Sequence, residues 1–97
     1  MALLVKMDGS MDEIVIPEEG QLRFLQKHVA GNIEMVPVSD PNMVKRGYVY
    51  AICNEEGKIN DMPVNSVATT LSGRDGSMGF RDPFAGDVIF TKEGEVD

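Results

Sequence analysis

The side chains best suited to binding a ligand lie in the middle of the chain, where an apolar segment runs into a polar turn. Asn54 and Asn65 carry amides that can donate and accept hydrogen bonds at once. Glu56 can accept from a ligand N–H, and Lys58 offers a mobile positive charge. These residues predict a ligand-binding turn between a strand and the next helix. A structural interpretation stays open beside it, because Asn-Glu-Glu-Gly is a good turn sequence and Asn65 can serve as a helix cap.

A second candidate element is the glycine-rich segment from Gly73 to Gly86, which holds four glycines and one proline among fourteen residues. Arg74 and Arg81 are its only positive charges, and Phe80 lies between them. Arginine pairs bidentately with phosphate, and an aromatic ring can stack on a base. The segment therefore predicts a local anion site that the net charge conceals. The alternative is a solvated surface loop whose arginines pair with nearby aspartates, Asp75, Asp82 or Asp87.

Templates for catalysis and for metal binding find no match in the chain. There is no glycine-rich phosphate loop ending in Lys-Ser/Thr, no nucleophile elbow and no cysteine pair for zinc. The stretch from Asp8 to Asp12 is superficially similar to a calcium loop, but it lacks the spacing and the terminal bidentate acid, and a hairpin turn explains it better. We therefore expect a protein that is not an enzyme and that needs no cofactor or metal.

The charge balance argues against one class of partner. The 97 residues include 16 acids and 9 bases, for a net charge of −7. Because the phosphate backbone repels such a surface, duplex nucleic acid is not an expected partner. An acidic imitation of DNA would need a denser acidic surface, whereas here the acids come in pairs with bases interspersed.

Cysteine usage and hydropathy indicate the compartment. The single cysteine, Cys53, cannot form an internal disulfide and lies in an apolar run, where we expect it to pack. The N-terminal segment lacks a basic leader, and the longest apolar run is far short of a membrane span. These features predict a cytoplasmic protein with no membrane partner.

Hydrophobic periodicity predicts one α+β domain over residues 1–97, with a mainly antiparallel sheet and the element order β-β-α-β-β-α-β. The expected elements are a hairpin with strands 2–7 and 14–16, a helix over 18–30, a strand over 32–38, a turn at 40–42, a strand over 47–53 that is central in the sheet, a helix to about residue 71 capped by Asn65, and a strand over 87–91. Residues 93–97 are an acidic tail that we expect to fray.

The clearest helix is the one expected from Glu18 to Ala30. Leu22, Leu25 and Val29 recur at three- and four-residue spacing, which predicts that they face the core. Gly31 follows where a left-handed terminating residue belongs.

The chain resembles a family of small uncharacterised domains common in bacteriophages, plasmids and bacterial mobile elements. The matching segments are Val29-Ala-Gly-Asn-Ile-Glu-Met-Val36, Asn54-Glu-Glu-Gly-Lys58, Pro63-Val-Asn-Ser-Val-Ala-Thr69 and Gly86-Asp-Val88. They cover roughly residues 20 to 92 in the right order. The family pattern often has an aromatic residue where Asn32 stands. The resemblance implies an accessory protein of a phage or mobile element, acting in the host cytoplasm, and it does not identify a ligand.

Three hypotheses follow. The preferred one is a non-enzymatic binder, as a monomer or a homo-oligomer, that captures a small anionic ligand such as a nucleotide-derived signal and so counters host defence. The second is an acidic protein–protein inhibitor or adaptor that acts on a host nucleic-acid enzyme. The third is an enzyme that acts on a nucleotide.

Overall fold

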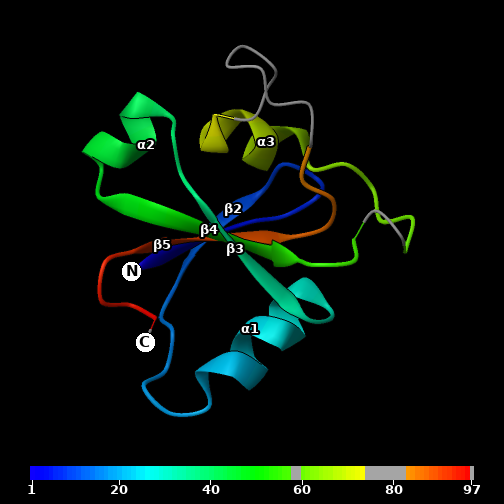
Figure 1. Cartoon of the computed structure of the whole chain (residues 1–97), viewed down its shortest axis with the longest axis horizontal. Coiled ribbons are helices and arrows are strands. Elements are labelled where there is room, and N and C mark those ends of the chain that lie inside the picture. The colour runs from blue at the N-terminus through cyan, green and yellow to red at the C-terminus, as the bar shows by residue number, and fades with distance from the viewer. Residues whose placement is uncertain (58–59, 74–82, 97) are drawn as a thin grey trace.

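A computed structural model describes residues 1–57, 60–73 and 83–96 of the chain. Five strands and three helices form in these residues (Figure 1). In chain order they are β1 (Ala2–Val5), β2 (Met11–Ile14), α1 (Gln21–Val29), β3 (Ile33–Pro37), α2 (Pro41–Lys45), β4 (Tyr48–Asn54), α3 (Ser66–Ser72) and β5 (Val88–Lys92). The expected α+β class is confirmed, with one helix more than the sequence predicts.

The five strands form one sheet in the order β2-β1-β5-β4-β3, and every neighbouring pair is antiparallel. β5 therefore occupies the centre, although it is last in the chain. β4 is an interior strand beside it, and β3, which ends in Pro37, lies at the edge as expected.

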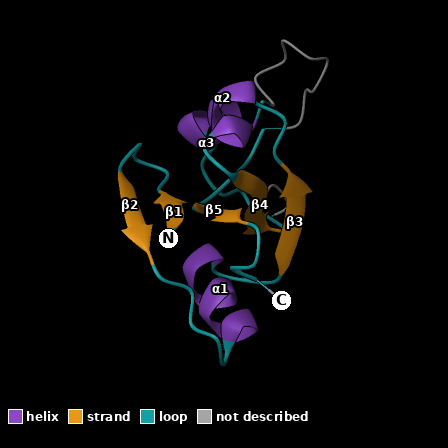
Figure 2. Cartoon of the chain, turned by 90° about the vertical axis from the view of Figure 1, so that its left-hand side faces the viewer, coloured by secondary structure: helices purple, strands orange, loops and turns teal. Residues whose placement is uncertain are grey.

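Helices cover both faces of the sheet, so the domain has three layers (Figure 2). α2 and α3 lie on one face and α1 on the other (Figure 1). Each face has its own core, with Met43 and Ala68 packing on the first and Leu25 and Val29 on the second. Cys53 is buried in the first core, as the apolar run predicts.

The N-terminal hairpin is tighter than expected. The Lys6 N–H donates to the Ser10 carbonyl, and the Gly9 N–H donates back to the Lys6 carbonyl. Because the turn spans only residues 6–10, Val5 pairs with Met11 and the return strand ends at Ile14. The expected return strand over 14–16 is thus displaced along the chain by the turn geometry.

Helix α1 begins at Gln21, three residues after the expected start, and the residue before it, Gly20, has a left-handed φ of 70°. Glu18 and Glu19 therefore precede the helix and do not occupy its first turn. Leu25 and Val29 face the core as predicted, but the prediction for Leu22 is wrong, because 57% of it is exposed.

The end of α1 also differs from the sequence-based prediction. Ala30, rather than Gly31, takes the left-handed conformation, with φ 62°. The Ala30 N–H closes the helix by donating to the Gln26 carbonyl. Gly31 is instead needed because the Asn54 side chain packs closely against it.

Helix α2 replaces a predicted turn. Asp40 accepts a hydrogen bond from the Met43 N–H at 3.1 Å, and Pro41 is the first helical residue. An N-terminal cap followed by proline is a known helix-start signal, so this helix could have been predicted from the sequence. Met43 anchors this short helix in the core.

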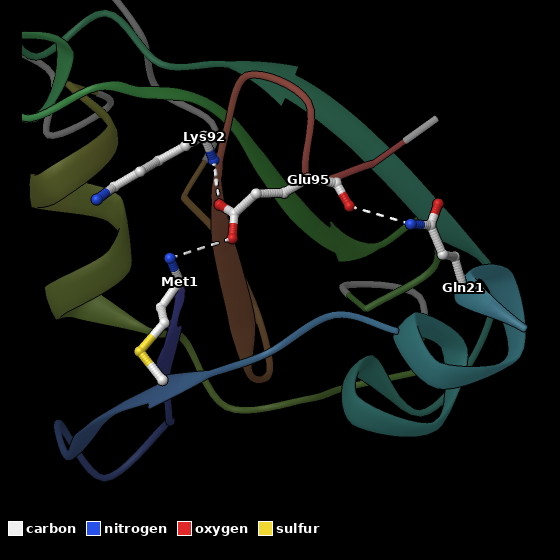
Figure 3. Close-up of polar contacts among 4 residues, drawn as sticks. All are labelled: Met1, Gln21, Lys92 and Glu95. Atoms are coloured by element: carbon white, nitrogen blue, oxygen red, sulfur yellow. Dashed lines mark hydrogen bonds and ion pairs between the residues drawn. The ribbon is translucent and has the colours of Figure 1, made fainter. Parts of the chain in front are cut away.

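Residues 93–96, where the sequence predicts fraying, are tied to the rest of the domain by Glu95 (Figure 3). One carboxylate oxygen accepts from the Lys92 N–H at 2.6 Å, and the other lies 3.5 Å from the N-terminal ammonium of Met1. The Glu95 carbonyl accepts from the Gln21 side chain at 3.1 Å. These contacts link the C-terminal turn to both β1 and α1.

No helix in the described part of the chain is long and apolar enough to cross a membrane.

Candidate functional site

The turn after β4 is held in place by Asn54, the last residue of that strand. Its amide nitrogen donates to the carbonyls of Val29 and Ala30 at 3.0 and 3.1 Å, and its oxygen accepts from the Glu56 N–H at 2.7 Å. The side chain is buried. Both amide hydrogens are thus committed to the end of α1, and the structural interpretation of this residue gains direct support.

Close packing at this point explains Gly31. A Cβ added to Gly31 would lie 2.7 Å from the Asn54 amide nitrogen, closer than real contacts allow. Glycine is therefore required because the amide of Asn54 occupies the space beside it. Gly31 and Asn54 belong to two of the four segments that carry the family resemblance, so those two segments meet at this contact.

Asn65 caps α3, as the sequence predicts, and also links two distant segments. Its oxygen accepts from the Ala68 N–H at 3.0 Å. Its nitrogen donates to the carbonyls of Val5 and Gly86, both at 2.9 Å. The residue is fully buried. All three hydrogen bonds are internal, so this amide joins α3, β1 and the approach to β5.

The remaining predicted site residues divide into two groups. Glu56 is exposed on the turn, and its backbone carbonyl accepts from the Asn60 N–H. The others lie outside the described residues: Lys58, Arg74, Phe80 and Arg81.

The segment before α3 and the segment before β5 lie side by side in the described part of the chain. The Asn65 N–H donates to the Phe84 carbonyl at 2.8 Å, and the Gly86 N–H donates to the Pro63 carbonyl at 2.9 Å. A Cβ on Gly57 would lie 3.0 Å from the Ala85 carbonyl oxygen. Two segments that are about twenty residues apart in sequence are therefore side by side.

A cavity of about 430 Å³ opens between these two segments. We call it the crevice, and its lining residues are Asp61, Met62, Val64, Pro83 and Ala85. Its volume falls within the roughly 300–1,000 Å³ that small-molecule sites occupy. The walls are mainly apolar, with one carboxylate at Asp61.

A second surface depression was not anticipated from the sequence. We call it the α1 hollow: it has a volume of about 490 Å³ and is lined by Arg23, Gln26, Lys27, Gly31 and Asn32. Arg23 and Lys27 are four residues apart, so a helical projection places them on one face. The four-residue spacing of two basic residues within a predicted helix is the sequence signal that could have indicated this basic surface.

The titratable groups of the described chain include one with a clear shift. Hydrogen bonds from the Ser10 side chain and backbone lower the pKa of Asp8 below its ordinary value of 3.8. Asp8 therefore stabilises the hairpin turn, in line with the sequence-based preference for a turn over a calcium loop. The described residues contain no cluster of three or more His, Cys, Asp or Glu side chains that could hold a metal ion.

The fold and these features define a small α+β domain with an antiparallel five-stranded sheet, a crevice beside the turn after β4 and a basic hollow at the end of α1. The chain belongs to the family described as Domain of unknown function (DUF3846), whose model matches residues 1–97. No curated protein and no solved structure matches it.

Proposed function

We propose that this protein is a non-enzymatic binding protein that captures a small anionic, nucleotide-derived ligand in the crevice. The observation that carries the proposal is the pairing of residues 63–65 with residues 84–86, fixed by backbone hydrogen bonds on both sides of Val64. A cavity framed by paired backbone segments is largely pre-formed, which lowers the entropic cost of binding.

The chemistry of the lining supports a ligand with a flat apolar part. Met62, Val64 and Pro83 offer apolar surface for a base, and the Asp61 carboxylate can accept from a base N–H. Lys58 precedes Asp61 by three residues in the sequence and Arg81 precedes Pro83 by two, and both cations lie outside the described residues. The preference for an anionic ligand rests on these two cations, which the sequence predicts as its partners.

The biological role that we propose is sequestration. A phage or mobile-element accessory protein of this kind would lower the free concentration of a host signal, in the host cytoplasm, and so counter host defence. The resemblance of its motifs to domains common in phages and mobile elements supports this role. Association into a homo-oligomer would add stability to a domain of this size.

The test is binding of linear and cyclic nucleotides, measured by thermal shift and calorimetry on the intact protein. The informative variant is Val64→Glu, which places a charge in the crevice on a side chain that is 55% exposed, so the fold should persist. Val44→Glu is the matched control, because Val44 is 51% exposed on α2, outside the crevice lining.

We expect a nucleotide in the panel to bind the wild type and Val44→Glu alike, and Val64→Glu at least about tenfold more weakly, as repulsion of an anion inside a cavity would dictate. An absence of binding at high micromolar nucleotide by folded wild type would contradict the proposal. Equal binding by both variants would contradict the crevice as the site.

The alternative function, an acidic inhibitor or adaptor, is favoured by one specific surface. Residues 7–19, which we call the acidic edge, contain five acidic and no basic residues. All five carboxylates are exposed: Asp8, Asp12, Glu13, Glu18 and Glu19. This segment includes β2, which among the described residues pairs with β1 alone, so its other edge is available to a partner strand.

This alternative predicts association with a basic protein that weakens as salt rises, since exposed charges are screened over a Debye length of about 8 Å at physiological salt. A pull-down from a bacterial lysate at low and high salt, with wild type and an Asp12→Asn/Glu13→Gln variant, tests it. Capture of a basic nucleic-acid enzyme by the wild type but not by the double variant would favour it over nucleotide binding. Capture that the variant retains in full would contradict it.

A further inference from the structure

The α1 hollow gathers positive charge on a protein that is strongly acidic overall. Its lining holds two cations, Arg23 and Lys27, two amides, Gln26 and Asn32, and the backbone of Gly31, and it contains no acidic side chain. The chain as a whole carries a net charge of −7. A local basic depression on such a surface is therefore a distinct electrostatic feature.

The two cations of the hollow are not neutralised within the described chain. The ion pairs among the described residues join Met1 to Glu95 and Lys6 to Asp12, and neither involves Arg23 or Lys27. Like charges four residues apart on a helix repel one another. An anion between them would relieve that repulsion, so the hollow attracts negative charge from solution.

The end of a helix ordinarily disfavours an anion, because its last carbonyls carry partial negative charge. Here those carbonyls are occupied by internal donors. The Asn54 amide donates to the carbonyls of Val29 and Ala30, and the Gln26 carbonyl accepts from the backbone N–H groups of Ala30 and Gly31. The cost that the helix dipole would impose on a bound anion is therefore reduced.

The amides of the hollow are arranged to donate. The Gln26 side-chain nitrogen donates to the Asn32 side-chain oxygen at 3.3 Å, which directs the Asn32 nitrogen elsewhere. No described residue accepts a hydrogen bond from that nitrogen. The backbone carbonyl of Asn32 accepts from the Glu55 N–H at 2.8 Å, which fixes the residue against the turn after β4.

We propose that the α1 hollow is a binding site for a phosphate-bearing anion, held by Arg23 and Lys27 with Asn32 as an additional donor. Charge matching selects the class of ligand. A phosphate monoester carries a charge of about −1.5 to −2 at pH 7, which balances two cations, whereas a single carboxylate balances one. The guanidinium of Arg23 adds a planar pair of donors that suits phosphate oxygens.

This site is separate from the crevice and goes beyond the proposed function. The turn after β4 lies between them, because Glu55 contacts Asn32 on one side and Gly57 packs against Ala85 on the other. The lining residues of the two sites do not overlap. Each site can therefore fail its test without affecting the other.

The experiment is an NMR titration of the ¹⁵N-labelled full chain with inorganic pyrophosphate at low ionic strength, using three proteins. The test variant is Arg23→Gln/Lys27→Gln, and both side chains are exposed, so its melting temperature should match that of wild type. The control is Lys6→Gln/Lys45→Gln, which removes the same amount of charge from two exposed lysines outside the hollow.

We expect saturable shifts of backbone amides in residues 23–32 of the wild type and the control, and affinity about tenfold lower in the test variant. The matched control separates a local site from a general effect of net charge. Three outcomes would overturn the proposal: no saturable binding by wild type, equal affinity in the test variant, or an equal loss in the control. Nucleotide binding at the crevice, measured with Val64→Glu, is unaffected by any of them.

Discussion

The amide nitrogen of Asn54 occupies the space that a side chain on Gly31 would need, since a Cβ at that position would lie only 2.7 Å from the nitrogen. The same nitrogen donates to the two carbonyls that end α1. A single contact between a strand end and a helix end thus fixes the glycine, the helix terminus and the turn after β4.

Replacing Gly31 with alanine should destabilise the protein by about 1–3 kcal/mol, because the new methyl group forces the Asn54 amide away from its carbonyl partners. Chemical unfolding of wild type and variant measures the change. In an Asn54→Ala background the space is already empty, so the same substitution should cost much less. Equal costs in the two backgrounds would mean that the contact does not explain the glycine.

Replacing Ala30 with glycine should have the opposite effect. Ala30 has a left-handed φ of 62°, which costs an L-residue roughly 1–2 kcal/mol, whereas glycine adopts it freely. After the extra unfolded-state entropy of glycine is subtracted, we expect a net stabilisation of about 0.5–1 kcal/mol. The comparison is Ala68→Gly within α3, which should destabilise by about 2 kcal/mol, because it lowers helix propensity and also removes a buried methyl group. Loss of stability in Ala30→Gly would contradict the assigned backbone conformation.

Local sequence signals predicted most of the fold. Alternation and turn residues located four of the five strands, and the apolar spacing of Leu25 and Val29 located α1. The return strand expected over residues 14–16 shares only Ile14 with the observed β2. The sequence around Asp40 also contains a cap followed by proline, so α2 was predictable in principle. The exact start of α1 was not, because the left-handed Gly20 before it depends on how residues 15–20 cross to the other face of the sheet.

The candidate site was harder to predict, because its side chains act through partners far away in sequence. Asn54 bonds to carbonyls 24 and 25 residues away, and Asn65 bonds to one 60 residues away. An asparagine that closes a helix and one that reads a ligand have the same identity and similar local sequence. Only the tertiary arrangement of strands shows that both amides are engaged internally.

Asn65 should matter for stability to a degree that capping alone does not explain. Asn65→Ala removes the cap of α3 and leaves the buried carbonyls of Val5 and Gly86 without a donor, so we expect a loss of about 3 kcal/mol. Asp40→Ala removes only the cap of α2 and should cost about 1 kcal/mol. Urea unfolding of the two variants makes the comparison.

A third variant separates the two roles of the same residue. Asn65→Asp keeps the oxygen that caps α3 but loses both donors and directs a carboxylate at the two carbonyls. We expect it to be at least as destabilising as Asn65→Ala. Stability close to that of wild type in Asn65→Asp would show that the bonds to Val5 and Gly86 contribute little.

The hairpin turn before β2 makes a prediction about protonation. Hydrogen bonds from the Ser10 hydroxyl, and then from its backbone N–H, lower the pKa of Asp8 below 3.8. The contribution of this carboxylate to stability is therefore present above the unfolded-state pKa and is lost as the pH falls through the lower folded-state pKa. In Ser10→Ala the pKa of Asp8 should rise toward 3.8 yet stay below it, because the backbone N–H still donates at 2.8 Å.

A ¹³C NMR titration of the Asp8 carboxyl resonance measures this pKa in the wild type and in Ser10→Ala. Ser39→Ala is the control, since the Ser39 hydroxyl donates to the Ser72 carbonyl and its loss should leave the pKa of Asp8 unchanged. An identical Asp8 pKa in wild type and Ser10→Ala would show that the Ser10 hydroxyl does not donate a hydrogen bond to the Asp8 carboxylate.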